Sequence, residues 1–361
     1  MIEVSDAARS VIDSGTFTYH VRASSWLAGQ LLADEVPIAA GSEDGDRSLS
    51  VPERVILTVP KRSAGVDWTP TTDEHPLAAN GQTLQVSLGV GKGLDGVEWF
   101  QRAELLIVET TEQDETVTVT CAGLLALVDE AKFVAAFQPS GLITQTLRAL
   151  LEPAVTVDLT AAPADRSVPV STINWDSDRL GAVYELLDAW PADLRMHAQG
   201  YAQIVEDVAP TVAVRSFTNG TGGTVVTAAG TSTRDGGFNV VVATGYAADG
   251  SEVRGVAYVT DGPWAYGAGP ANPLPVPFGY ASPLLTTNAQ CTAAAATVLR
   301  RKMRQAVLRR YTITCPPDPT LQLGDAVAIT TEHVTALLCT VEGLTLPYTP
   351  GTMTIQVVAT A

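Results

Sequence analysis

Cysteine is scarce in this chain, and its four cysteines stand far apart: Cys121, Cys291, Cys315 and Cys339. No Cys-x-x-Cys pair occurs, and the four histidines show no ligand spacing, so the sequence indicates neither a zinc site nor a redox motif. We therefore expect no metal and no cofactor. We interpret the four cysteines as buried free thiols.

Positive charge is scarce as well. The chain has 22 Lys and Arg against 39 Asp and Glu, which gives a formal net charge of -17. The basic field that attracts a phosphate backbone is missing, so we do not expect sequence-independent binding to DNA.

Long hydrophobic runs are absent. No apolar segment approaches the about 18 residues that span a bilayer, and residues 1–6 lack the basic and apolar regions of a signal peptide. We expect no membrane insertion, and synthesis and folding in a cytoplasm.

Catalytic motifs are missing too. The chain has no Gly-x-Ser-x-Gly sequence, and Gly89–Gly93 lacks the length and final hydroxyl residue of a phosphate-binding loop. Its acidic clusters fall at predicted loops and helix starts, where solvated faces and caps are the usual explanation rather than a glycosidase carboxylate pair. The stretch 41–50, for example, is interpreted as a solvated loop. We expect a protein that is not an enzyme.

The residues that are abundant favour strands and turns. Hydrophobic residues make up 46% and charged residues 17%, with 30 Gly and 22 Pro among many Thr and Val, a composition typical of a globular, strand-rich chain. At 361 residues the length suggests two to four units.

Changes in periodicity divide the chain. Thr116–Thr120 alternates as a half-buried strand does, whereas leucines recur at helical spacing after Ser140, a plausible N-cap, and a second helix follows Asp178. The expected fold class is mainly β with α/β insertions, that is, two related small β-barrels, an α/β domain and a loop-helix insertion. The expected ranges are 1–125 for the first barrel, 126–210 for the α/β domain, 211–245 and 308–361 for the second barrel, and 246–307 for a proline-rich loop and a helix.

The closing strands repeat the opening ones in outline, with four segments in the same order and with apolar residues in the same phase. The paired segments are 54–60 with 310–316, 76–86 with 319–329, 105–109 with 338–342, and 116–120 with 352–356. We interpret this as a duplication, the alternative being chance similarity of two β-meanders. Three chains with two barrels each could form a ring of six barrels that fits a six-fold partner.

The sequence resembles the tail-tip or baseplate hub proteins of long-tailed phages, in particular minor tail proteins of actinophages. The resemblance rests on Asn239–Gly245, Phe278–Tyr280 with Ser282 and Pro283, the helix from Thr286 to Arg300, and Pro316–Asp325. It implies a homotrimeric, pseudo-six-fold ring at the virion tail tip, beneath a distal tail protein hexamer. It also implies contact with the tape measure protein and with further tail-tip or fibre proteins, and DNA only in transit.

Three features of the chain leave alternatives open. The chain ends directly after the second barrel, so we expect no lytic or receptor-binding module, although a receptor- or carbohydrate-binding tail protein remains the second hypothesis. The proline-rich loop carries aromatic residues that would pin it to its own chain or to a neighbour. The basic cluster at 300–310 is either a solvated helix end or a contact with a partner. The candidate interface residues are Trp264, Tyr266, Phe278, Tyr280, Arg300, Arg301 and Arg304.

Overall fold

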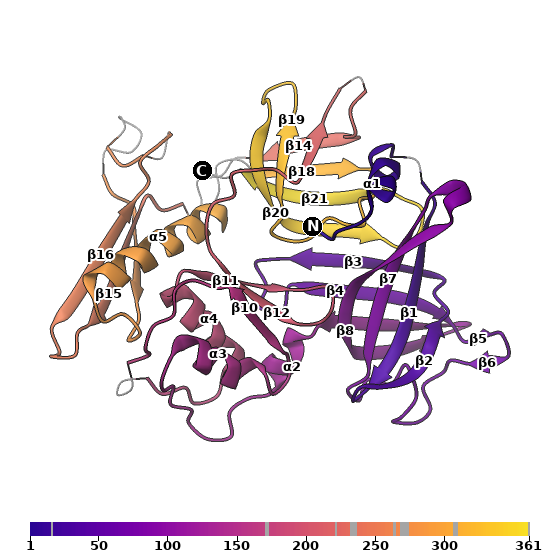
Figure 1. Cartoon of the computed structure of the whole chain (residues 1–361), viewed down its shortest axis with the longest axis horizontal. Helices are drawn as coiled ribbons and strands as arrows, with labels where there is room; N and C mark the ends of the chain where they lie inside the picture. Colours follow the sequence, from indigo (N-terminus) through magenta and orange to yellow (C-terminus); the bar gives the residue numbers. More distant parts are fainter. Residues whose placement is uncertain are drawn as a thin grey trace.

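The computed structural model of the chain is mainly β, with five α-helices in its described part (Figure 1). The described residues are 1–15, 17–169, 173–220, 222–231, 237–262, 265–267, 274–305 and 310–359. Most strands belong to one sheet of 13 strands, which winds through both halves of the molecule.

In the amino-terminal part of this sheet, buried residues alternate with half-buried ones along β9, where Val117, Val119 and Cys121 are buried. Helix α1 (Asp6–Asp13) and the small hairpin of β5 (Arg62–Ser63) and β6 (Val66–Asp67) lie outside the large sheet. Six of its strands form the first strand set, namely β1 (Tyr19–Leu27), β3 (Ala40–Asp46), β4 (Glu53–Pro60), β7 (Thr83–Gly91), β8 (Val97–Gln113) and β9 (Thr116–Gly123), and β2 (Gln30–Val36) is added to β1.

The carboxy-terminal part of the sheet contributes six more strands, the second strand set. They are β13 (Arg215–Thr218), β14 (Thr227–Thr231), β18 (Arg310–Cys315), β19 (Ala326–Thr330), β20 (Leu337–Pro347) and β21 (Met353–Ala359). The second set joins the first where β20 pairs with β3, from Gly343 opposite Asp46 to Pro347 opposite Ser42. The buried apolar residues of both sets form one continuous core.

The two strand sets have the same order. The first pairs as β3-β4-β9-β8-β7-β1 and the second as β14-β18-β21-β20-β19-β13, with each strand in the same sequential position. One difference is direction, because β1 runs antiparallel to β7 whereas β13 runs parallel to β19. This agreement is what a duplication predicts, whereas closure of each set into a barrel stays a prediction.

The β-bulges of the two sets correct the sequence alignment in one place. The β8–β9 register shifts between Ile107 and Glu109, and the β20–β21 register shifts between Val341 and Gly343. Ile107 therefore corresponds to Val341, and 105–109 corresponds to 339–343 rather than to 338–342. The prediction was wrong by one residue because both segments are apolar enough to align in either phase.

The α/β unit holds the chain between the two sets. Its elements are α2 (Leu125–Glu130), α3 (Ile143–Leu151), β10 (Val157–Ala161), α4 (Arg179–Ala189), β11 (Ala192–Met196) and β12 (Ala202–Glu206), with a sheet ordered β10-β12-β11. Asp178 caps α4 through Gly181, as expected. Ser140 does not cap α3, since the helix begins after Leu142, whose backbone N–H donates to the Gln145 side chain.

A further small sheet and the last helix form the insertion. β15 (Val240–Tyr246) pairs with β16 (Glu252–Tyr258) and β17 (Pro277–Ala281), and α5 (Asn288–Gln305) packs against β15 and β16 (Figure 1). The expected second-barrel boundary at residue 245 is therefore wrong, because Val240–Tyr246 pairs within the insertion. Its apolar β-branched run did not reveal which sheet it joins.

Candidate functional site

The joint between the strand sets, where β20 pairs with β3, combines backbone hydrogen bonds with an ion pair. Arg102 of β8 is 4% exposed and binds both carboxylate oxygens of Glu43 on β3, at 2.8 and 2.6 Å. Its remaining nitrogen donates to the carbonyl of Leu321 at 2.6 Å, and the Tyr348 hydroxyl donates to Glu43 at 3.2 Å. One buried guanidinium therefore connects β8 and β3 to the segment that leads into β19.

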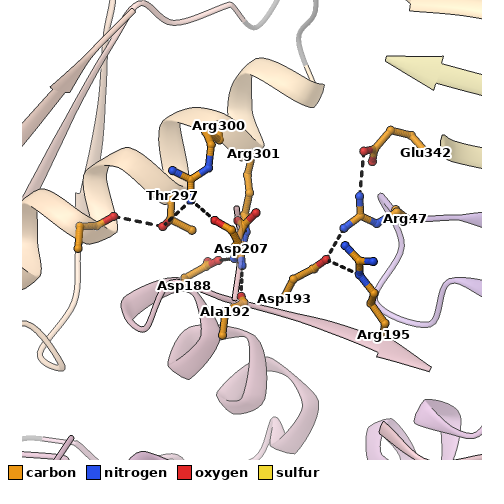
Figure 2. A network of polar contacts seen from close by, with 11 residues as sticks. Arg47, Asp188, Ala192, Asp193, Arg195, Asp207, Thr297, Arg300, Arg301 and Glu342 are labelled. Atoms are coloured by element: carbon orange, nitrogen blue, oxygen red, sulfur yellow. Dashed lines mark hydrogen bonds and ion pairs between the residues drawn. The ribbon is translucent and has the colours of Figure 1, made fainter. Parts of the chain in front are cut away.

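A second arginine lies where three units meet. Arg47, in the turn after β3, binds Glu342 at 2.9 Å and Asp193 of β11 at 2.6 Å (Figure 2). Asp193 also accepts from Arg195 at 3.3 Å. Burial lowers the pKa of the Arg47 guanidinium, but its carboxylate neighbours raise it by more, and the net pKa lies above the usual value. Glu342 is the extra residue of the β20 bulge, which directs its side chain at Arg47.

The third part of this junction fixes helix α5 to the α/β unit. Arg301 of α5 binds Asp207 at 3.2 Å, the carboxylate of Asp188 and the carbonyl of Ala192 (Figure 2). Burial raises the pKa of Asp188, and the charge of Arg301 opposes that rise. Arg300 donates to Thr297 at 3.3 Å and to the Asp207 carbonyl.

We call Arg47, Arg301 and their partners in Figure 2 the polar junction. It joins the first strand set, the second strand set, the α/β unit and the insertion. Buried ion pairs add little net stability over apolar packing, but breaking one of them is costly. The junction therefore links the four parts of the chain, and loss of one partner would leave a partly buried charge without its counter-ion.

A cleft of about 730 Å³ lies between the strand sets and the α/β unit. Among its described lining residues, Arg102 and Arg47 are already held by carboxylates. Glu53 is different, because its Oε2 is buried without a hydrogen-bond partner in the described part of the chain, and burial raises its pKa to about 7. Glu43 and Glu104 also line the cleft, and Glu43 is held by Arg102.

The predicted aromatic interface residues fall in different environments. Tyr266 is 46% exposed and stacks on Tyr258 with ring centroids 5.7 Å apart. Phe278 and Tyr280 lie on β17 and pack against the core of their own chain, and burial raises the pKa of the Tyr280 hydroxyl. Trp264 lies outside the described residues. Their role in an assembly interface stays a prediction.

The predicted basic interface residues are engaged within the chain where they are described. Arg300 and Arg301 belong to the polar junction, an arrangement that neither the solvated-helix interpretation nor the partner-contact interpretation included. Arg304 lies in α5, and its side chain lies outside the described residues. A contact of this cluster with a partner stays a prediction.

The sequence did not reveal the partners of Arg47 and Arg102. The stretch 41–50 was expected to be a solvated loop, but it contains β3, and Glu43 within it is 8% exposed. The interpretation was wrong because the compensating charge comes from Arg102, far away in the sequence. The signal for Arg102 in the sequence was weak, because Gln101 and Glu104 lie close to it in β8.

No metal-binding cluster of His, Cys, Asp or Glu occurs among the described residues. None of the helices in the described part of the chain combines the length and the apolar run that a membrane crossing requires. The four cysteines are buried free thiols, as expected.

Solved phage tail proteins share the fold over nearly the whole chain. A tail protein from Neisseria meningitidis is 12% identical with a TM-score of 0.65, covering 94% of this chain and 96% of its own. The 43 kDa tail protein of prophage MuSo2 from Shewanella oneidensis is 12% identical with a TM-score of 0.60, covering 94% and 98%.

A third structure extends the likeness beyond phages. The E. coli c3393 protein, a component of the type VI secretion system that is similar to the T4 tail proteins gp27 and gp5, is 10% identical with a TM-score of 0.50, covering 93% and 77%. No protein-family model and no curated protein matches the chain. The chain has the fold of phage tail proteins, which confirms the fold that the sequence resemblance implied.

Proposed function

We propose that this chain is a structural tail-tip hub of a bacteriophage with a long tail. Three copies form a pseudo-six-fold ring that closes the distal end of the tail tube and lets DNA pass on infection. The observation that carries the proposal is that one chain contains two strand sets of identical order, joined by pairing of β20 with β3. Three such chains supply six similar positions, which suits a six-fold neighbour.

The ring would contact a distal tail protein hexamer on one side. The tape measure protein and further tail-tip or fibre proteins are its other partners, and DNA meets it only in transit. The net charge of -17 agrees with passage rather than with binding, because an acidic wall does not hold a phosphate backbone. The protein would be made in the cytoplasm of the host bacterium and would end up at the tail tip of the virion.

A role without catalysis is supported by the polar side chains themselves. Arg47 and Arg301 are paired with carboxylates that belong to other units of the same chain, and Arg102 is paired with Glu43 of its own strand set. Such pairs hold units in place. The fold shared with tail proteins points the same way.

The test is electron microscopy of the purified protein in negative stain. An annulus with six lobes supports the hub. Isolated single-chain particles at every concentration would contradict it.

One observation favours a second candidate function, a receptor- or carbohydrate-binding tail protein. Tyr258 and Tyr266 are 50% and 46% exposed and stack on each other, and exposed aromatic faces suit the apolar face of a sugar. Binding of host cell-wall polysaccharide that is lost in Tyr258→Ala and Tyr266→Ala would favour this candidate.

A further inference from the structure

Several strand edges have no strand partner in the described part of the chain, and those of β8 and β14 are two of them. β7 covers one edge of β8 only as far as Leu106, and β9 covers the other edge, so Glu109–Gln113 is paired on one side. β14 pairs with β18 on one side only. Both edges are exposed at most positions. Open edges are sites where another chain can add a strand.

The second strand set shows which strand pairs with the edge that corresponds to this part of β8. In the second strand set, β19 covers β20 as far as Thr340, and the following half, 343–347, pairs with β3. Matching backbone hydrogen bonds lie where β7 stops covering β8 and where β19 stops covering β20. The Ile107 N–H donates to the Gln82 carbonyl and the Val341 N–H donates to the Asp325 carbonyl, both at 2.9 Å. The half-strand 343–347 is therefore the counterpart of 109–113.

The partner strand has a counterpart as well. β3 pairs with β4 so that Gly41 faces Leu57, and β14 pairs with β18 so that Ala228 faces Ile313. Leu57 and Ile313 hold the same place in the two sets, because they face Val119 of β9 and Ile355 of β21. β14 therefore occupies the same position in the second strand set as β3 does in the first.

We propose that Thr111–Gln113 of β8 pairs antiparallel with β14 of a second copy of this chain. The register follows from β20 and β3, where Thr345 faces Asp44 and Pro347 faces Ser42. It places Thr111 opposite Thr231, Glu112 opposite Gly230 and Gln113 opposite Ala229 of the second copy. This inference rests on the proposed ring, for which it supplies the contact between chains.

Three physical features agree with this pairing. The contact is heterologous, and repetition of one heterologous contact closes a ring when the rotation fits. Ala229 and Gly230 are small, so their side chains do not hinder the approach of a second strand. Figure 1 shows β14 in the upper part of the second strand set, on the side away from the first set.

The joint between chains would differ from the joint within the chain in one respect. Glu43, which holds Arg102 in the inner joint, corresponds to Gly230 in β14. The outer joint therefore lacks that buried ion pair. Pairing between chains then rests on the backbone ladder, and it can be broken without unfolding either strand set.

Paired cysteine substitutions test the register. Thr111→Cys with Thr231→Cys, treated with a mild thiol oxidant, should give covalent dimers and trimers on a gel without reductant. Thr345→Cys with Asp44→Cys, the corresponding pair within the chain, should form an internal bridge and stay a monomer on the gel. Thr111→Cys with Thr227→Cys is the mismatched control, because its second site lies about 13 Å along β14, and it should give at least tenfold less crosslinking.

The outcomes separate this inference from the ring. A particle of three chains whose 111 and 231 cysteines do not react, while the internal pair does, overturns the β8–β14 contact and leaves the hub standing. Equal crosslinking of the mismatched pair overturns the register. A chain that stays a monomer at all concentrations overturns the ring and this contact together.

Discussion

Arg102 connects the two strand sets, because it binds Glu43 of the first set and the Leu321 carbonyl ahead of β19 in the second. It is buried with Glu43, and removal of one partner of a buried pair leaves an uncompensated charge, at a cost of about 3–5 kcal/mol. We expect Arg102→Met to lower the free energy of unfolding by that amount in urea denaturation, and the double variant with Glu43→Gln to recover part of the loss.

The control for Arg102 is an exposed pair of the same chemistry. Arg148 and Glu152 form an ion pair one helical turn apart in the exposed part of α3 and at its end. Arg148→Met should cost less than about 1 kcal/mol. Equal losses in the two variants would show that Arg102 does not act as a buried joint.

Glu53 predicts a pH dependence of stability. Its pKa in the folded chain is about 7, above the ordinary value of 4.5, because burial disfavours the carboxylate. Its contribution to stability is therefore fully present below about pH 4.5 and is lost as the pH rises through 7.

The variant Glu53→Gln removes this titration. We expect the variant and the unaltered chain to unfold at similar temperatures at pH 5, and the variant to be more stable at pH 8.5 by about 1–3 kcal/mol. Glu130→Gln, at an exposed helix end, reports the general effect of removing one negative charge. A stability difference that is the same at both pH values would contradict the assignment.

At the scale of elements, Gly255 of β16 allows α5 to pack closely against the insertion sheet. A Cβ at Gly255 would lie 2.1 Å from the backbone nitrogen of Thr292, whereas a Cβ at Gly279 on β17 would meet nothing within 4 Å. We expect Gly255→Ala to push α5 away and cost about 2–4 kcal/mol, and Gly279→Ala to cost little. Thermal unfolding with limited proteolysis of the insertion measures both, and equal effects would refute the close helix-to-sheet contact.

The sequence predicted the elements better than their partners. β9 and β21 were evident because one buried face imposes a period of two, and α5 begins at Asn288, two residues after the expected start at Thr286. The sequence did not indicate which sheet β15 joins, because strand pairing depends on contacts between residues that are far apart in the sequence. The one-residue error in aligning β8 with β20 has the same origin, since only the paired strands β9 and β21 reveal the two bulges.

At the scale of the whole molecule, the duplication was visible in the sequence but the polar junction was not. Arg47 contacts Asp193 and Glu342 only after three units have folded together. No local sequence pattern therefore predicts these ion pairs. The candidate interface residues illustrate the same limit, because Arg300 and Arg301 proved to be engaged inside the chain. Charge clusters suggest a contact, but folding decides with which surface.

In the proposed hub, one chain occupies two positions of the ring. Native mass spectrometry of the assembled protein, at concentrations where annular particles form, measures the number of chains in a particle. We expect a closed particle of three chains. A particle of six chains would contradict it, because the two strand sets of each chain would then not share one ring of six.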